Sequence, residues 1–404
     1  MPDTAVRREP VVSTARVPML RPFSHAAHAR AHAESVLIQC NIGGAVGWGE
    51  GAPRPYVTGE TSQSASEALA GAGSRLLLDH LTDLWKSGAS FEDGPRFLMA
   101  LDIPRLLGGL HRAPAAAAAL ETALLDAWCR LFGHPLRDVV AAVSPLLVNS
   151  TALIAPLPTP RPVALVVDLA NTERDAISSL TPAAAANLRH VKLKASASPS
   201  DTAERARELR TRLAALSAGA VTLSVDANGA WDGPQSLLAA ELLGGVVDWL
   251  EEPTVPRSWG DLRTIRERTG MAIMLDESAI DSGDVETAAN LAAADSINIR
   301  VSKCGGLLPA LRVAMAARSC GLGLQVGVQV AEIGPLWVVG RILATHLSGL
   351  LAVEAGRQDE WFDPPLTYPP YRIDRTRHLA PEFDGIGLGV IPSPALRTHC
   401  PTLV

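Results

Sequence analysis

The sequence predicts an α/β fold, in which a smaller α+β domain precedes a parallel (β/α) barrel of the TIM type. The main observation is a series of short apolar runs between residues 190 and 306, each ending in charge: VKLKAS, LSVDANGAW, VDWLEEP, IMLDES and INIRVSKCGG. Each run has the length and β-branched content of a strand buried on both faces, and a helix-length segment separates it from the next. The second observation is the length of 404 residues, which suits a barrel of about 250 residues plus a smaller domain.

The charged residues of these runs recur at a nearly constant interval. Lys194, Asp226, Glu251, Asp276 and Arg300 are separated by 32, 25, 25 and 24 residues. One strand, one loop, one helix and one return loop need about this length, so each residue takes the same place, the C-terminal end of its strand. We therefore expect these side chains to converge at the mouth of a barrel.

Three of these residues are carboxylates on adjacent strands. Asp226, Glu251 and Asp276 would repel one another unless a cation lay between them. Hard oxygen ligands suit Mg²⁺ best, with Mn²⁺ as an alternative. The spacing thus predicts a divalent metal site.

The N-terminal third has the signals of an α+β domain over residues 11–140. Residues 1–10 are charged and aperiodic, so we expect them to be disordered, and residues 11–61 alternate like strands with a Gly43-Gly44 hairpin turn. Helices are expected between residues 62 and 132, including the run PAAAAALETALLDAWCRLFGHPL, which Gly133 and Pro135 would end.

The barrel is expected over residues 148–355, starting near Val148 with VNSTALI. The following unit, up to residue 190, is broken by prolines and its ends cannot be placed. The outer helices are expected at residues 201–217, 235–243, 258–268, 282–291, 307–320 and 336–346. Two further strands are LGLQVGVQ and LLAVEAG, and a Pro- and Gly-rich return over residues 356–404 should bury Phe362, Tyr368 and Tyr371.

Composition excludes several classes of protein. The content of 47% hydrophobic and 19% charged residues is typical of a soluble globular protein, and a net charge of −6 with scattered basic residues predicts no nucleic-acid partner. No apolar run is long enough to span a membrane and the first ten residues are not a signal peptide, so a cytoplasmic location is expected. Five cysteines without a CxxC spacing predict no zinc site.

Five motifs resemble the enolase superfamily, in particular its muconate-lactonizing (muconate cycloisomerase) subgroup. They are Lys192-Leu193-Lys194, Asp226-Ala227-Asn228-Gly229, Trp249-Leu250-Glu251-Glu252-Pro253, Asp276-Glu277-Ser278 and Lys303-Cys304-Gly305-Gly306. The resemblance implies a modified, enolase-like barrel, an N-terminal capping domain whose loops close over the barrel mouth, and a C-terminal return that packs on this domain. It also implies a lysine base that acts with Mg²⁺ to form an enolate.

Four residues are candidates for catalysis: Lys192, Lys194, Arg300 and Lys303. The two lysines of the first motif lie two positions apart and point the same way; in the family the second moves the proton and the first stabilises the anion. Arg300 stands where the subgroup usually carries a further lysine, and Lys303, three positions on, cannot share its face on a regular strand. An arginine is a poor proton carrier, which favours chemistry with one base.

Further residues are candidates for supporting the site or for binding the substrate. Glu252 and Glu277 follow the metal-ligand candidates by one position, so we expect them to support the site from the other strand face. Two loops of the first domain, residues 21–28 and 53–61, should reach the barrel mouth. The candidates for direct contact with the substrate are Asn228, Tyr56, Arg54, Gln329, Glu332 and Glu354.

Three hypotheses on function follow. The leading one is an Mg²⁺-dependent enzyme that abstracts the α-proton of a small carboxylate substrate, as a cycloisomerase or syn-dehydratase with Lys194 as the single base. The alternative is a racemase or epimerase of an amino-acid derivative or dipeptide, and the third is a catalytically silent barrel that binds a carboxylate. We expect a homo-oligomer in each case.

Overall fold

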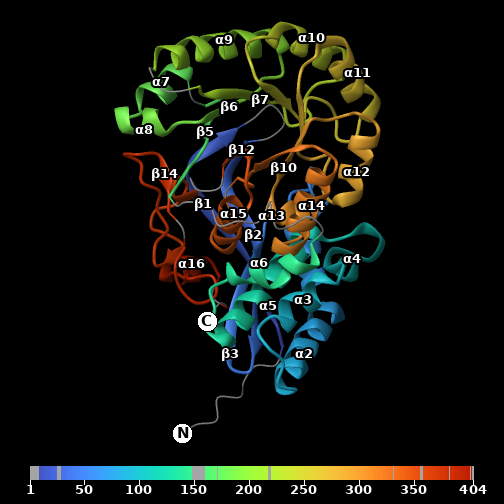
Figure 1. The fold of residues 1–404 in the computed structure, drawn as a ribbon. Coiled ribbons are helices and arrows are strands. Elements are labelled where there is room, and N and C mark those ends of the chain that lie inside the picture. The colour runs from blue at the N-terminus through green and yellow to red at the C-terminus, as the bar shows by residue number, and fades with distance from the viewer. Residues whose placement is uncertain are drawn as a thin grey trace.

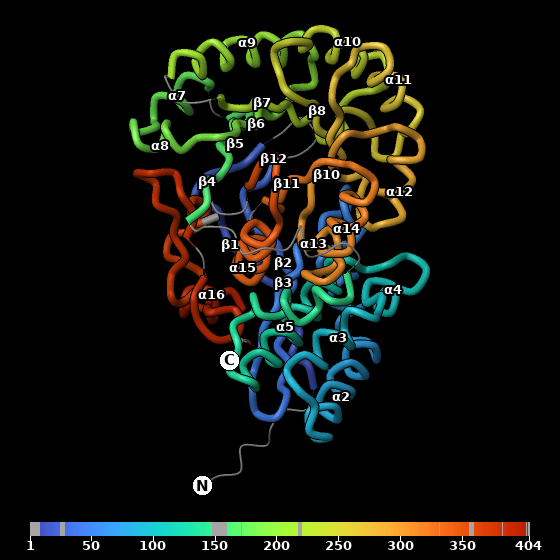
Figure 2. The backbone as a smooth tube through the Cα atoms, viewed as in Figure 1, coloured from blue at the N-terminus to red at the C-terminus, as the bar shows by residue number. Residues whose placement is uncertain are grey.

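The structure is a computed structural model that describes residues 9–402, apart from residues 25–28, 148–159, 171, 217–219, 331, 355–357, 382 and 401. Figure 1 shows two layered parts, a barrel with outer helices and a strand-and-helix part that contains the N-terminal third of the chain. The C-terminal segment runs alongside both (Figure 2). The predicted α/β class and the predicted order of the two parts are confirmed.

The N-terminal part begins with an antiparallel sheet of three strands in the order β1-β2-β3. Their bounds are β1 Val11–Ser24, β2 Ala29–Ile42 and β3 Ala45–Gly51. The predicted hairpin turn is present: Gly43 and Gly44 have φ values of 58° and 92°, in the region that favours glycine. The expected loop of residues 21–28 begins as the end of β1, and its remaining residues 25–28 lie outside the described residues.

Helices cover this sheet. They are α1 Ser62–Ala70, α2 Ala72–Lys86, α3 Asp93–Met99, α4 Ile103–Gly108, α5 Pro114–Phe132 and α6 Asp138–Val143, with 3₁₀ turns η1 Gly109–His111 and η2 Ser144–Leu146. Helix α5 ends where the sequence predicts, because Gly133 takes a left-handed conformation.

Helix α5 packs unusually closely on β3, and two sequence patterns explain why. Two residues of strand advance about 6.7 Å and four residues of helix about 6 Å, so a glycine at every second position can face an alanine at every fourth. A Cβ atom on any of these glycines would overlap the helix backbone. The facing pairs are Gly51 with Ala115, Gly49 with Ala119 and Gly47 with Ala123.

The barrel sheet has eight parallel strands in the order β12-β11-β10-β9-β8-β7-β6-β5. Their bounds are β5 Leu165–Val167, β6 His190–Lys194, β7 Thr222–Asp226, β8 Trp249–Glu251, β9 Ile273–Leu275, β10 Ser296–Ile299, β11 Gly323–Val326 and β12 Leu350–Val353. The N–H of Ala164 donates to the carbonyl of Val353 at 2.7 Å, which connects the two edge strands. The strand expected near Val148 lies outside the described residues.

The outer helices start and end within two residues of their predicted positions. They are α9 Pro199–Ala215, α10 Gly233–Leu243, α11 Trp259–Thr269, α12 Ser282–Asn290, α14 Leu307–Ser319 and α15 Pro335–His346. The unplaced unit contains β4 Arg161–Pro162, α7 Glu173–Ser178 and α8 Pro182–Asn187. One short helix, α13 Val301–Cys304, directly follows β10 and was not predicted.

The C-terminal segment returns to the first part, as the resemblance implies. Its elements are η4 Gln358–Glu360, β13 Thr367–Tyr368, β14 Leu379–Ala380, β15 Ile391–Pro392 and α16 Pro394–His399. The indole N–H of Trp48, on β3, donates to the carbonyl of Val390 at 3.2 Å. Phe362 and Tyr371 are buried, but the expectation for Tyr368 is wrong, because its short strand leaves it 64% exposed.

Candidate active site

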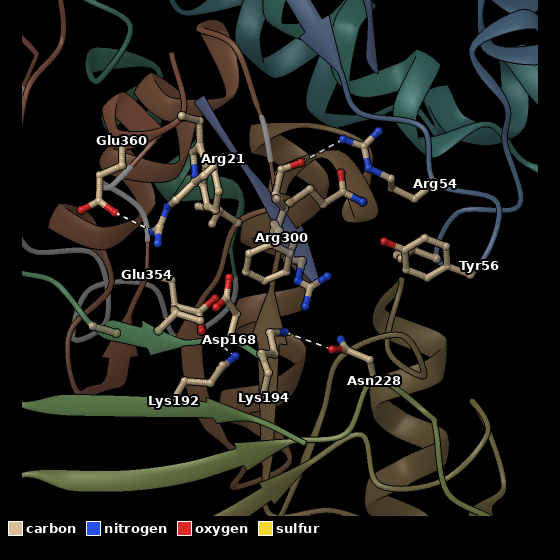
Figure 3. A pocket seen from close by; sticks show the side chains of 18 residues that line it. Arg21, Arg54, Tyr56, Asp168, Lys192, Lys194, Asn228, Arg300, Glu354 and Glu360 are labelled. Carbon is tan, nitrogen blue, oxygen red and sulfur yellow. Dashed lines mark hydrogen bonds and ion pairs between the residues drawn. The ribbon is translucent and has the colours of Figure 1, made fainter. Parts of the chain in front are cut away.

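A cavity lies at the C-terminal ends of the barrel strands, and side chains from both parts of the chain line it (Figure 3). Eight of the predicted site residues are among them: Lys192, Lys194, Arg300, Asn228, Tyr56, Arg54, Gln329 and Glu354. The barrel contributes the floor, and the end of β1 and the loop after β3 contribute further side chains.

The three predicted metal-ligand residues meet beside this cavity. Asp226 ends β7, Glu251 ends β8 and Asp276 directly follows β9; the first two are direct neighbours in the parallel register. All three are buried, and one carboxylate oxygen of each lies within 4.8 Å of the others. The equal spacing of the βα units therefore brings them together as predicted.

This donor set fits a hard divalent cation. All three donors are carboxylate oxygens, which Mg²⁺ and Mn²⁺ prefer. Within the described part of the chain, Asp276 Oδ2 is buried without a hydrogen bond, although Arg300 Nη2 contacts it as an ion pair. A buried oxygen of this kind is available to a metal ion.

Lys192 is a fixed charge within the floor. Its Nζ lies 2.6 Å from Glu251 Oε2 and 2.5 Å from Glu354 Oε1. Burial alone would lower the pKa of Lys192, but the carboxylates of Glu251, Glu354 and Asp226 together outweigh it and raise the pKa. In this arrangement Lys192 stays protonated, which suits electrostatic stabilisation of an anion.

Lys194 reaches the cavity from the same face of β6. Its Nζ lies 2.5 Å from Asp226 Oδ2 and donates to Asn228 Oδ1 at 3.0 Å. The amide nitrogen of Asn228 donates in turn to Glu277 Oε1 at 3.2 Å, so the predicted Asn228 orients the lysine. Asn228 has a φ of 48°, which places its side chain over the strand end immediately before Gly229.

Arg300 and Lys303 occupy different places. Arg300 lies between β10 and α13 and lines the cavity, and it contacts Asp276 and lies 3.9 Å from Glu277 Oε1. Lys303 is completely buried and is not among the described residues that line the cavity. Its Nζ donates to Asp276 Oδ1 at 3.0 Å and to the carbonyl of Asn298 at 2.7 Å. The unexpected helix α13 turns Lys303 back under the metal-ligand candidates, where it can hold Asp276.

The two acidic residues expected behind the site behave differently. Glu252 accepts hydrogen bonds from the backbone N–H of Asp276 at 2.8 Å and of Ser278 at 3.1 Å, and so fixes the turn after β9. Glu277 reaches towards Asn228 and Arg300. Burial raises the pKa of Glu252 to about 7 and that of Glu277 to about 8.

Residues of the first part fasten the barrel loops. The guanidinium of Arg54 donates to the carbonyls of Glu34 at 2.8 Å and Val330 at 3.0 Å. Burial lowers the pKa of Arg54 to about 10. These bonds make Arg54 a brace between the two parts of the chain, while the residue also lines the cavity, as expected for a substrate contact. Glu332, also expected at the substrate, accepts from the N–H of Gln329 at 2.8 Å and supports the loop that carries it.

The Gly305-Gly306 pair has a structural cause. Glu121, on α5, accepts hydrogen bonds from the N–H of Leu307 at 2.6 Å and of Leu308 at 2.9 Å, at the first turn of α14. A Cβ atom on Gly306 would overlap the Glu121 carboxylate, and both glycines have φ above 100°. This motif therefore makes room for a carboxylate that caps a barrel helix from the other part.

Ten further residues line the cavity that the sequence reasoning did not name individually, and five of them are charged or aromatic: Arg21, Phe23, Asp168, Glu360 and Trp361. Arg21 and Phe23 fall within the loop range expected to reach the mouth. Nothing in the local sequence marks Glu360 or Trp361, because only the return of the C-terminal segment brings them to β1. The scarcity of lysine is a sequence signal that could also have marked the site. The chain has four lysines, and three of them are the site candidates Lys192, Lys194 and Lys303.

Comparison with known proteins agrees with this geometry. Residues 8–140 match the family model "Mandelate racemase / muconate lactonizing enzyme, N-terminal domain", and residues 176–395 match "Enolase C-terminal domain-like". The chain therefore belongs to the enolase superfamily and is an enzyme of that superfamily. Within it, the chain falls in the branch of mandelate racemase and muconate lactonizing enzyme.

Several relatives share most of the chain. The L-Ala-D/L-Glu epimerase of Bacillus subtilis (strain 168) is 28% identical over 325 residues, which cover 78% of each chain. An aromatic dipeptide epimerase of Herpetosiphon aurantiacus is 29% identical over 325 residues, 78% of this chain and 80% of the relative. The muconate lactonizing enzyme of Pseudomonas fluorescens, solved with muconolactone, has the same fold, with a TM-score of 0.79, 20% identity, and coverage of 96% of this chain and 97% of that one.

Within the described ranges, none of the helices combines the length and the apolar character needed to cross a membrane.

Proposed function

We propose that this enzyme is a racemase or epimerase that removes and returns the α-proton of an amino-acid derivative or a dipeptide. Two relatives that match 78% of the chain are named as an L-Ala-D/L-Glu epimerase and an aromatic dipeptide epimerase, which supports this alternative over the cycloisomerase or dehydratase hypothesis. The observation that carries the proposal is that Lys194 and Arg300 line one cavity (Figure 3). Three converging carboxylates lie beside it.

Asp226, Glu251 and Asp276 would hold Mg²⁺, or Mn²⁺ in its place. When bound, the metal supplies positive charge that stabilises the enolate formed when the α-proton leaves. Lys303 and Glu252 hold Asp276 in place from behind.

The proton is moved by Lys194 in this proposal. Its Nζ is at the cavity, and Asn228 fixes its direction, so a substrate α-carbon can lie within reach of the amine. Lys192, buried and protonated, would hold the developing negative charge. The resemblance of the motif Lys192-Leu193-Lys194 to the enolase superfamily supports both roles.

Inversion also requires a proton to arrive on the other face of the enolate. Arg300 is the side chain at the corresponding strand end, and in an epimerase it would supply that proton itself or through water. A guanidinium loses its proton reluctantly, and here it forms an ion pair with Asp276. These two facts favour a second candidate, chemistry on one face by Lys194 alone, such as cycloisomerisation or syn elimination.

The stereochemistry of exchange separates the candidates. Purified enzyme with Mg²⁺ in D₂O would be incubated with a set of dipeptides and N-acyl amino acids, and deuterium at the α-carbon measured by mass spectrometry alongside chiral chromatography. Inversion at a rate comparable to exchange supports an epimerase. Exchange with full retention of configuration, or elimination without any inversion, overturns it in favour of the one-base candidate.

A further inference from the structure

The wall of the cavity next to Lys194 is made by aromatic side chains from two distant segments. We propose that this wall, Phe23 with Trp361, is a subsite for an uncharged, apolar side chain on the substrate, with an aromatic ring as the best occupant. This inference rests on the proposed function, since it assigns the side chain attached to the α-carbon that Lys194 would deprotonate.

The position of the base places the substrate side chain. A reacting carbon must come within about 3–3.5 Å of Lys194 Nζ. The ring centroid of Phe23 lies 5.9 Å from the same Nζ. An α-carbon that Lys194 reaches on the side of Phe23 can therefore present its substituent to this ring.

Trp361 extends this surface towards the mouth. Its ring meets that of Phe23 edge to face, with centroids 5.6 Å apart and planes at 82°. The N–H of Leu20 donates to the carbonyl of Trp361 at 2.9 Å, which ties the C-terminal segment to β1 and holds the two rings together. Aromatic pairs in this arrangement favour a further ring or a bulky aliphatic group against them.

The rest of the side-chain environment is also apolar. Val57, Val166, Val328 and Val330 line the same cavity, together with Ala164. These side chains come from both parts of the chain and add apolar surface to that of Phe23 and Trp361. An apolar substrate group gains about 25 cal/mol for each Å² that it buries there.

The charges that line the cavity already have partners. Arg21 Nη2 lies 3.5 Å from Glu360 Oε2, and the Arg21 guanidinium also stacks on Trp361 at 5.0 Å from its centroid. Lys192 pairs with Glu354 at 2.5 Å.

Lys194 pairs with Asp226 and Arg300 with Asp276. The partners of the other two charged residues, Arg54 and Asp168, include backbone groups. Arg54 is bound to carbonyls, and Asp168 Oδ1 accepts from the N–H of Ala170 at 3.1 Å. A charged substrate side chain would have to break one of these pairs or remain uncompensated, and breaking the pairs of Lys192 and Arg54 is costly because both residues are buried. The subsite therefore suits a dipeptide with an aromatic side chain better than a dipeptide with a glutamate side chain.

Four dipeptides with the same first residue test this inference: L-Ala-L-Phe, L-Ala-L-Leu, L-Ala-L-Glu and L-Ala-L-Lys. With α-deuterium incorporation as the readout, we expect kcat/KM for the Phe and Leu compounds to exceed that for the Glu and Lys compounds at least about tenfold, a difference of about 1.4 kcal/mol. Equal rates, or a preference for either charged compound, would overturn the subsite.

Variants of Trp361 locate the effect. Trp361→Ala should raise KM for L-Ala-L-Phe several-fold and raise KM for L-Ala-L-Ala by a smaller factor, and Trp361→Phe should restore most of the loss for L-Ala-L-Phe. Trp259→Ala, on α11, is the matched control and should change neither. An unchanged KM for L-Ala-L-Phe in Trp361→Ala would overturn the assignment of this wall.

Failure of the subsite can be told apart from failure of the proposed function. If none of the four compounds exchanges, the proposed reaction fails, and calorimetric binding of the same four in the presence of Mg²⁺ decides the subsite alone. Tighter binding of the Phe and Leu compounds supports it. Equal or absent binding, or tighter binding of the charged compounds, overturns it.

Discussion

Glu50 connects the two parts of the molecule, and its removal gives a prediction that can be worked out bond by bond. The residue is completely buried on β3, and its carboxylate accepts from Ser35 Oγ at 2.9 Å, from Ile333 N–H at 2.7 Å and from Gly334 N–H at 2.9 Å. Ile333 and Gly334 directly precede α15 and follow the loop that carries Gln329. Glu50 therefore fastens a cavity loop from outside the barrel.

In Glu50→Gln, one carboxylate oxygen becomes an N–H₂ donor that faces a backbone donor. The variant loses at least one hydrogen bond to a charged acceptor, which costs about 1.5–3 kcal/mol. Glu50→Ala leaves two buried N–H groups unsatisfied, at about 1–3 kcal/mol each. Against a total stability of about 5–15 kcal/mol, both losses are measurable.

The assay is urea unfolding at pH 7 followed by tryptophan fluorescence, with kcat/KM on the best substrate. Because the Glu50 variants loosen the loop after β11, we expect kcat/KM to fall by about 10- to 100-fold. Glu67→Gln, on the exposed face of α1, should stay within about 0.5 kcal/mol of the wild type. If Glu50→Gln unfolds at the same urea concentration as Glu67→Gln, the reasoning about this clasp is refuted.

Three further predictions concern the metal, Arg300 and pH. Mg²⁺ at 100 times its dissociation constant should stabilise the protein by about 2.7 kcal/mol, and Asp276→Asn should largely abolish the rise in melting temperature; an unchanged rise would contradict the metal assignment. Arg300→Ala should slow turnover by raising the activation free energy by about 2–4 kcal/mol. Arg300→Lys should retain or increase inversion, measured by chiral chromatography. An equal loss of activity in both variants would contradict a proton transfer or an anion contact at this position. Burial raises the pKa of Glu121 from 4.5 to about 8, so the folded protein holds a proton that the unfolded chain has lost. Its contribution to stability should therefore fall as pH rises towards 8, and Glu121→Gln should show a flatter dependence in urea unfolding; identical slopes would contradict this.

The barrel and its carboxylates could be predicted because both depend on local patterns. Strands buried on both faces are continuous apolar runs, and a fixed unit length places Asp226, Glu251 and Asp276 at the same strand end. The glycines of β3 and the alanines of α5 are visible in the sequence as well, but their meaning appears only when the strand and the helix are packed together.

The remaining features of the site depend on contacts between distant segments. Phe23 and Trp361 are separated by most of the chain, and their pairing requires the C-terminal return to lie beside β1. Arg54 and Glu332 have residue types that suit a charged substrate, but the backbone groups that they also bind can be identified only in the folded state. Lys303 lies under Asp276 because α13 starts one residue after Arg300, and an ideal strand pattern does not indicate that turn.

The most direct measurement is α-proton exchange in D₂O with Mg²⁺ for the wild type and for Lys194→Ala, on the best dipeptide substrate. The exposed Lys86→Ala serves as the matched lysine control. We predict one deuterium at the α-carbon with the wild type and Lys86→Ala, and none with Lys194→Ala, while the Mg²⁺-dependent rise in melting temperature persists in all three. Exchange at the wild-type rate in Lys194→Ala would contradict the assignment of Lys194 as the base.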